Sequence, residues 1–108
     1  MSQDKWLEGK SGTLACSSNT HDGSLNFRWQ KDGTDIVAVD DAVAIHLINE
    51  RMSMLVLKRL TAADSGEYTC VASNIAGTAS ASKQMVVYGT FAFAYLDIFY
   101  QLKNTYKN

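Results

Sequence analysis

The sequence predicts an all-β fold in which two antiparallel sheets pack face to face as a sandwich. Besides a short edge segment at residues 5–7, seven short segments of alternating or β-branched residues are separated by polar turns, and none of them has a helical period. A turn leads directly into a strand at residues 64–70. A tryptophan also stands between the only two cysteines, in the order Cys16, Trp29, Cys70. These three observations together favour a small sandwich with a shared core.

Residues 64–70 read Asp-Ser-Gly-Glu-Tyr-Thr-Cys and specify a turn, a strand and a buried phenol. Asp64 can accept backbone N–H bonds in an Asx turn, and Gly66 supplies the φ freedom needed before a strand begins. Side chains alternate along a strand, so Tyr68 and Cys70 share one face. A tyrosine two residues before a cysteine is typical of a tyrosine corner, in which the hydroxyl bonds back to upstream main chain.

The first half of the chain contains four predicted strand segments. They are residues 5–7, 11–18, 25–29 and 36–39. The first is short, and we expect only an edge strand there. In the second, alternation places Leu14 and Cys16 inward and Thr13 and Ala15 outward. The fourth is a β-branched run suited to a sheet edge.

The second half contains two further segments, residues 44–48 and 52–57, before the strand that follows the 64–66 turn. Asn49, Glu50 and Arg51 form the hinge between these two segments. Residues 74–77 are a predicted hairpin turn, and residues 78–87 are the predicted last strand.

Three motifs resemble those of I-set immunoglobulin domains. Residues 29–33 (WQKDG) resemble their W-x-K-D-G turn, and residues 53–60 (SMLVLKRL) resemble their S-x-L-x-I-x-x-L strand. Residues 64–77 resemble their D-x-G-x-Y-x-C-x-A-x-N-x-x-G block. The motifs cover about residues 8–87, and the second half is similar in particular to arthropod Down-syndrome cell-adhesion molecules. Hemicentin, roundabout and peroxidasin domains are nearly as similar.

This resemblance implies an immunoglobulin-like sandwich with Greek-key topology over residues 1–88, with a truncated first strand. It implies a Cys16–Cys70 disulfide, which would stabilise the fold by roughly 4 kcal/mol in the chain-entropy model and indicates an oxidising compartment. The alternative is a reduced cysteine pair, as in the intracellular I-set domains of giant muscle proteins. The resemblance also implies a core signature. Its residues are Trp29, Leu57, Asp64 and Tyr68.

Residues 89–108 form an aromatic tail that is not part of the family pattern. It is either an extra strand, with Phe91, Phe93 and Tyr95 on one face, or a helix with Phe91 and Tyr95 on one stripe. Periodicity does not choose between the two. Asp97 interrupts the tail, and no run in the chain reaches the roughly 18 apolar residues of a membrane span.

The sequence predicts neither an enzyme nor a cofactor. No nucleophile, base and charge-stabilising group occur together, and Cys16, Cys70, His21 and His46 lack the spacing of a zinc site. The acidic residues lack the pattern of a calcium loop, and no glycine-rich phosphate loop is present. The net charge of −1 gives no reason to expect nucleic acid or an anionic membrane as a partner, and nothing indicates a small-molecule substrate.

An apolar patch is expected on the outer side of one sheet. Matching the family places Leu55 and Leu57 inward, which turns Met54 and Val56 outward beside Ala15. The predicted binding face is this patch with its neighbours. Its residues are Thr13, Ala15, His46, Met54 and Val56. Exposed apolar residues on a sheet can form an adhesive face. The alternatives are that the first strand or the tail covers them, or that they are an ordinary scatter of apolar residues.

The resemblance implies an extracellular recognition module of a cell-adhesion or axon-guidance type receptor, with homophilic binding to the same or related immunoglobulin domains as a homodimer. Residues 1–6 lack the apolar region of a secretory signal, so an extracellular domain would be part of a longer secretory-pathway protein, expected to be membrane-anchored at the cell surface. The alternative function is a structural spacer domain of a matrix or muscle cytoskeletal protein.

Overall fold

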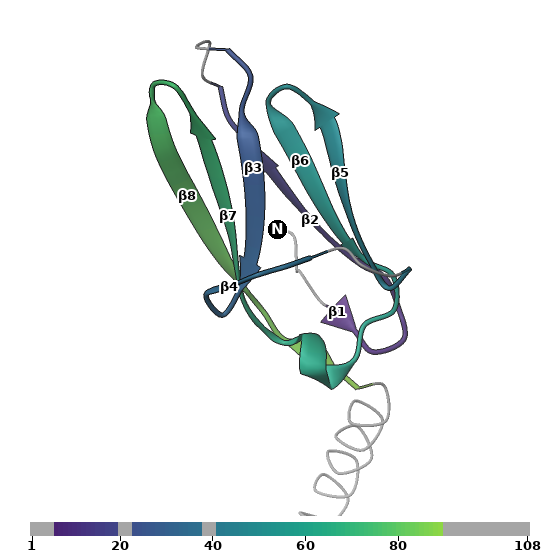
Figure 1. The fold of residues 1–108 in the computed structure, drawn as a ribbon. Coiled ribbons are helices and arrows are strands. Elements are labelled where there is room, and N and C mark those ends of the chain that lie inside the picture. The colour runs from purple at the N-terminus through teal and green to yellow at the C-terminus, as the bar shows by residue number, and fades with distance from the viewer. Residues whose placement is uncertain (1–5, 20–22, 38–40, 90–108) are drawn as a thin grey trace, which may run out of the picture.

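The computed structural model describes residues 6–19, 23–37 and 41–89, which form two antiparallel sheets packed face to face (Figure 1). The three-stranded sheet has the order β2 (Gly12–Ser17), β6 (Met52–Leu57), β5 (Val43–Asn49). The four-stranded sheet has the order β4 (Thr34–Asp35), β3 (Asn26–Lys31), β7 (Gly66–Asn74), β8 (Gly77–Met85). The predicted all-β, immunoglobulin-like sandwich is confirmed. The predicted tail, residues 89–108, lies outside the described residues except for Gly89.

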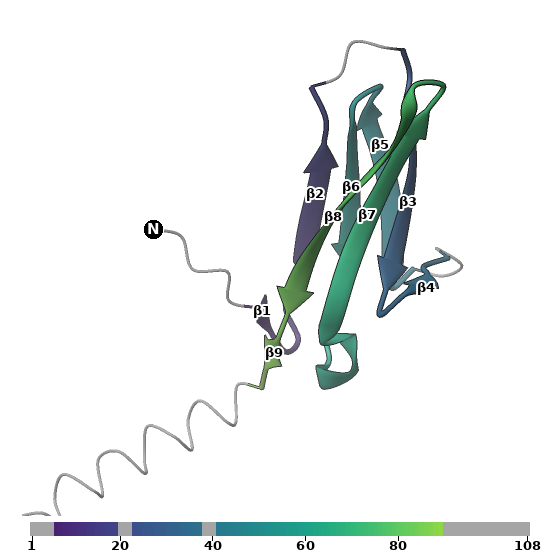
Figure 2. The same ribbon diagram turned by 90° about the vertical axis from the view of Figure 1, so that its left-hand side faces the viewer.

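Within the described residues the first strand is short, as predicted, and it pairs in a way that alternation does not reveal. β1 (Trp6–Leu7) runs parallel to β9 (Val87–Tyr88), and the Glu8 N–H donates to the Tyr88 carbonyl at 2.8 Å. The predicted single last strand, residues 78–87, is therefore two strands, β8 and β9. Within the described residues β2 pairs only with β6 and β8 only with β7, so their free edges lie on the same flank of the sandwich (Figure 2).

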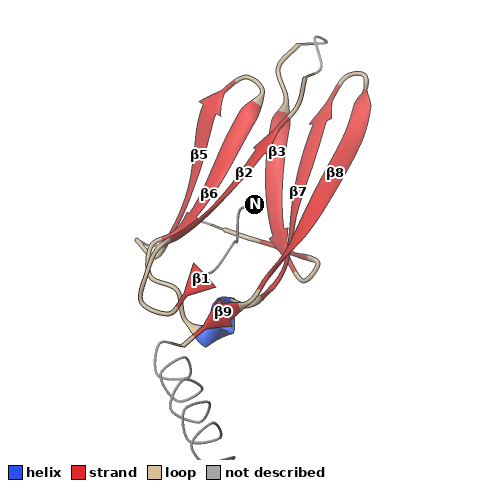
Figure 3. Ribbon diagram, turned by 180° about the vertical axis from the view of Figure 1, so that it is seen from behind, coloured by secondary structure: helices blue, strands red, loops and turns tan. Residues whose placement is uncertain are grey.

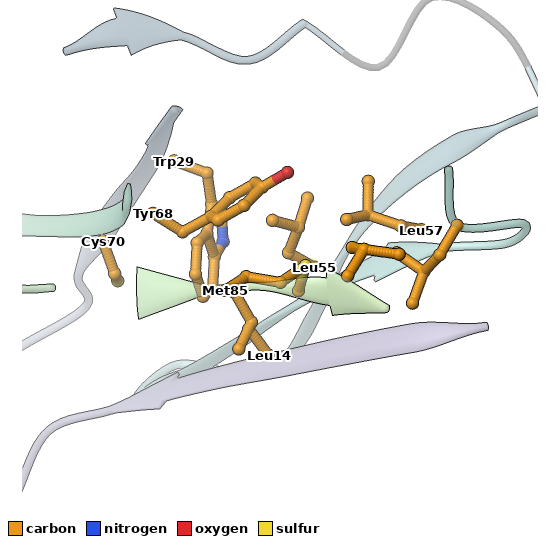
Figure 4. Packing of buried hydrophobic residues seen from close by; sticks show 9 residues of the cluster. Leu14, Trp29, Leu55, Leu57, Tyr68, Cys70 and Met85 are labelled. Atoms are coloured by element: carbon orange, nitrogen blue, oxygen red, sulfur yellow. The ribbon is translucent and has the colours of Figure 1, made fainter. Parts of the chain in front are cut away.

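The core lies between the sheets and is most completely buried near β9 and the short 3₁₀ helix η1 (Ala62–Asp64). The alternating burial of β6, in which every second residue is buried, follows from its central position in the three-stranded sheet. Figure 4 shows the core side chains from both sheets meeting in one cluster. The cluster comprises Leu14, Trp29, Leu55, Leu57, Leu60, Tyr68, Cys70, Met85 and Val87.

Two links join the sheets through this core. The predicted disulfide is present, and it connects Cys16 of β2 to Cys70 of β7. The Trp29 indole Nε1–H donates to the Ser53 Oγ at 2.9 Å, which satisfies two buried polar groups at once. Ser53 is 1% exposed, and its role as the partner of the tryptophan was not predicted.

The tyrosine corner has the expected geometry, because the Tyr68 hydroxyl donates to the Asp64 carbonyl at 2.6 Å. The expected Asx turn at Asp64 is wrong, however. Its Oδ2 accepts the upstream Thr61 N–H at 2.8 Å and so closes the single turn of η1. The carboxylate bonds upstream because Thr61 begins the turn and presents a free N–H there. Gly66 has a φ of 157°, and a Cβ there would lie 2.7 Å from Asp32 Oδ2.

The edge strand next to β3 lies earlier in the chain than predicted. Instead of a strand over residues 36–39, the structure has β4 at Thr34–Asp35. The reason is the tight turn at Asp32 and Gly33, where φ values of 50° and 85° reverse the chain at once. The Ile36 N–H still donates to the Trp29 carbonyl at 2.8 Å. Residues 38–39 lie outside the described residues.

Candidate functional site

The five residues of the predicted binding face lie together on the outer side of the three-stranded sheet, which we call the outer face. The strand register places Thr13 beside Val56, and Ala15 beside Met54. On the other side of β6, His46 lies beside Met54. The residues therefore form two adjacent rows across β2, β6 and β5, because residues of equal parity project to the same side of a sheet.

The outer face carries a half-buried centre and an exposed border. Met54 and Val56, on the central strand, are half-buried between their neighbours, whereas Thr13, Ala15 and His46 are exposed. The expectation that Met54 and Val56 project outward agrees with the register, but their neighbours cover part of each side chain. None of the five is an acid, a lysine or an arginine, so the face offers apolar and polarisable contact area with one imidazole at its margin.

Sequence reasoning missed two residues that extend this face. Met52 pairs with Ser17 on one side, and Ala44 pairs with Val56 on the other. Met52 is two residues from Met54 on β6, and Ala44 is two residues from His46 on β5. The same period-two alternation could therefore have identified both from the sequence. Their addition makes the apolar centre of the outer face continuous along β6.

Of the two segments that could cover the outer face, the first strand does not do so. β1 pairs with β9 at the end of the sandwich and does not lie over β2, β6 or β5. The other proposed cover, the aromatic tail, lies outside the described residues. Within the described residues no strand covers the outer face.

A cavity of about 390 Å³ opens on the flank between β2 and β8. Cys16 and Cys70 contribute to its lining, together with Ala72, Ala79 and Ala81, and the remaining lining residues are also uncharged. An acyl, phosphoryl or proton transfer site needs a positioned acid, base or nucleophile. Among the described residues that line this cavity there is no acid, lysine, arginine or histidine that could act as the acid or base of such a site.

The remaining candidates for chemistry are metal-ligating and histidine side chains. The described residues contain no cluster of three or more His, Cys, Asp or Glu side chains that could hold a metal ion. His46 lies on the outer face, and His21 lies outside the described residues. No helix in the described part of the chain is long and apolar enough to cross a membrane.

The pKa of Tyr68 is raised, and the cause of this shift is structural. Burial raises the pKa of the Tyr68 phenol to about 12, and the nearby Asp64 and Asp32 carboxylates contribute to the same shift. The phenol is 2% exposed and donates to the main chain of Asp64, so it is held neutral as a core hydrogen-bond donor. The perturbed group is therefore part of the tyrosine corner and not of a reactive site.

Comparison with known proteins agrees with this fold. The immunoglobulin domain model matches residues 1–74. The mouse cell adhesion molecule DSCAML1 is 34% identical over 74 residues, which are 68% of this chain and 4% of that protein. The crystal structure of the Dscam1 Ig7 domain, isoform 9, is similar with a TM-score of 0.72 and 27% identity, over 79% of this chain and 88% of that one.

An I-band fragment of titin is also similar, with a TM-score of 0.68 and 32% identity, and the match covers 79% of this chain and 29% of that one. The likenesses thus include both cell adhesion molecules and titin. The chain spans only a small share, about 4%, of the length of the first curated relatives that it matches.

Proposed function

The chain belongs to the immunoglobulin domain family, and on that premise we propose that it is an extracellular recognition module of a cell-adhesion or axon-guidance type receptor. Its partners are the same or related immunoglobulin domains, bound through the outer face. The parent protein is a longer, membrane-anchored protein of the cell surface. The relatives named as cell adhesion molecules support this class of function.

The observation that carries the proposal is the uncharged, apolar centre of the outer face. An antiparallel sheet with one side in water normally presents polar residues there. Here the central strand presents Met52, Met54 and Val56 instead, and no described strand lies over them. Charged residues are depleted in the cores of protein interfaces and Met is enriched, so this composition supports a protein partner.

Sedimentation of the full 108-residue chain over a concentration series tests the proposal. Met54→Lys and Val56→Lys place a charge in the centre of the outer face and should weaken self-association by about tenfold or more, because a buried unpaired ammonium opposes docking. Ser80→Lys makes the same charge change on exposed β8 of the other sheet and should have little effect. A chain that stays monomeric at high micromolar concentration, or equal effects of all three variants, would contradict homophilic binding through this face.

A structural spacer domain is the second candidate, and the 32% identity to the titin fragment supports it. A spacer domain transmits force through its sandwich and does not need a surface that binds a partner. Free thiols at Cys16 and Cys70 in material from the native compartment would favour this function, since cytosolic thiols normally stay reduced. Self-association that is lost with Met54→Lys would exclude it.

A further inference from the structure

The free edge of β5 offers a row of backbone groups for pairing. β5 pairs with β6 alone among the described strands. The Lys58 N–H donates to the Ala42 carbonyl at 2.9 Å, so Ala42 points its backbone groups toward β6. Antiparallel ladders alternate these directions, and Val43, Ile45 and Leu47 therefore point their N–H and C=O groups toward the free edge.

The side chains of these three residues make the edge apolar on its inner side. Val43 is half-buried and packs against the core, whereas Ile45 is 36% exposed and Leu47 is 65% exposed. β5 contains no acid, lysine or arginine. Natural sheets usually protect an edge with lysine, proline or an inward-pointing charge, and β5 has none of these over Val43–Asn49. Its only irregularity is a bulge between Leu47 and Asn49.

The regular part of β5 before this bulge is complementary to itself. If two copies pair antiparallel about a two-fold axis through Ile45, then Val43 lies opposite Leu47 of the other copy and Ile45 lies opposite Ile45. These are the residues whose backbone groups face the free edge, so each pair can exchange both hydrogen bonds. Their inner side chains then meet as apolar pairs, and Ala44 leaves room for His46 on the outer side. The two-fold axis repeats the Val43–Leu47 pair on both sides of Ile45, as in an isologous interface.

We propose that β5 pairs with β5 of a second copy of this chain, which joins the two three-stranded sheets into one continuous sheet. The exposed parts of Ile45 and Leu47 become the centre of the contact. Of the acids at the strand ends, Glu50 is ion-paired with Arg51 at 3.8 Å, and Asp41 lies just before the start of β5, opposite Asn49 of the other copy in this register.

The choice of partner rests on the self-association proposed above, but the surface is different. Ile45 and Leu47 lie on the inner side of the sheet, whereas Met54 and Val56 lie on the outer face. The two contacts can therefore fail separately. Both together produce assemblies larger than a dimer, and either one alone produces a dimer.

Cross-linking of the Ile45→Cys variant of the 108-residue chain is the direct test. The axis places position 45 of one copy opposite position 45 of the other, within the Cα separation that a disulfide needs. Mild oxidation should give a covalent dimer that is absent with Ala79→Cys, a matched substitution at an exposed position of edge strand β8. Equal cross-linking of both variants, or none with Ile45→Cys, would overturn the proposal.

Sedimentation of Leu47→Lys, Met54→Lys and the double variant separates the two contacts. An inward-pointing lysine on the edge should weaken the β5 pairing by about tenfold or more, while Ser80→Lys changes association by less than about twofold. Dimers that persist in Met54→Lys and disappear in the double variant would support edge pairing even if the outer face proves inactive. Leu47→Lys association equal to that of Ser80→Lys would refute edge pairing and leave the outer-face proposal standing. Leu47 is largely exposed, so this variant should fold.

Discussion

The two ends of this sandwich differ in how completely they bury their apolar residues. At the end that holds η1 and β9, which we call the closed end, Leu60 and Met85 are fully buried. At the opposite, open end, Leu47 of β5 is 65% exposed although it lies on the inner side of its sheet, and Ile75 in the β7–β8 turn is 100% exposed. The strands of the two sheets diverge toward this end (Figures 1 and 3).

This difference suggests that the closed end provides stability and the open end provides surface for a partner. The closed end concentrates the contacts that hold the fold, namely the tyrosine corner and the pairing of β1 with β9. The open end keeps apolar side chains that add little to folding because water still reaches them. Apolar residues that a fold does not need to bury are available for a partner. We therefore expect closed-end substitutions to change stability and open-end substitutions to change association.

The largest contrast is expected between two leucines. Leu60→Ala should lower the free energy of unfolding by about 2–5 kcal/mol, because it leaves a cavity at a fully buried site. Leu47→Ala should lower it by less than about 0.5 kcal/mol, because most of its side chain is already in water. Urea unfolding at low protein concentration, with the disulfide intact, measures both. Similar losses in the two variants would remove the distinction between the ends.

Alkaline pH should weaken the closed end selectively. Because the pKa of Tyr68 is raised to about 12 in the folded protein, its contribution is complete below pH 10.0, the ordinary tyrosine value, and is lost as the pH rises toward 12. The expected loss of unfolding free energy over this range is roughly 2 kcal/mol. Chemical unfolding at a series of pH values measures it. Tyr68→Phe should remove this part of the pH dependence, and an unchanged slope in that variant would contradict the assignment.

The link between the sheets at Trp29 should have a smaller effect. Ser53→Ala leaves the Trp29 indole N–H without its acceptor in a buried site, and the expected cost is about 1–2 kcal/mol. Thermal unfolding with the disulfide intact measures the loss. Ser80→Ala, a matched change at an exposed position of β8, should be nearly neutral. An equal effect of the two changes would show that the hydrogen bond contributes nothing to stability.

Local motifs explain how much of the fold could be predicted from sequence. The turn, tyrosine and cysteine at residues 64–70 act through neighbours in the chain, so their pattern reports their structure directly. The partner of the Trp29 indole lies 24 residues away, and no local pattern identifies Ser53 as that partner. The division of the last strand into β8 and β9 depends on pairing with β1, which also lies far away in the sequence.

The candidate surfaces were predictable to different degrees for a similar reason. Period-two alternation assigns Met54 and Val56 to the outer side of the sheet and would also have found Met52. It assigns Ile45 and Leu47 to the inner side and hence to the core. Alternation gives the side of a sheet but not the separation between two sheets, and the separation decides that Leu47 stays exposed.

Amide hydrogen exchange of the 108-residue chain at low and high concentration tests most directly whether exposed apolar residues of β5 serve association and not folding. Amides of Val43, Ile45 and Leu47 face the free edge and should exchange fast in dilute solution, then become protected as copies associate. Amides of Ala44 and His46 bond to β6 and should be protected at both concentrations. Protection at the three free-edge positions that does not change with concentration would contradict the account, because the free edge of β5 would then take no part in association.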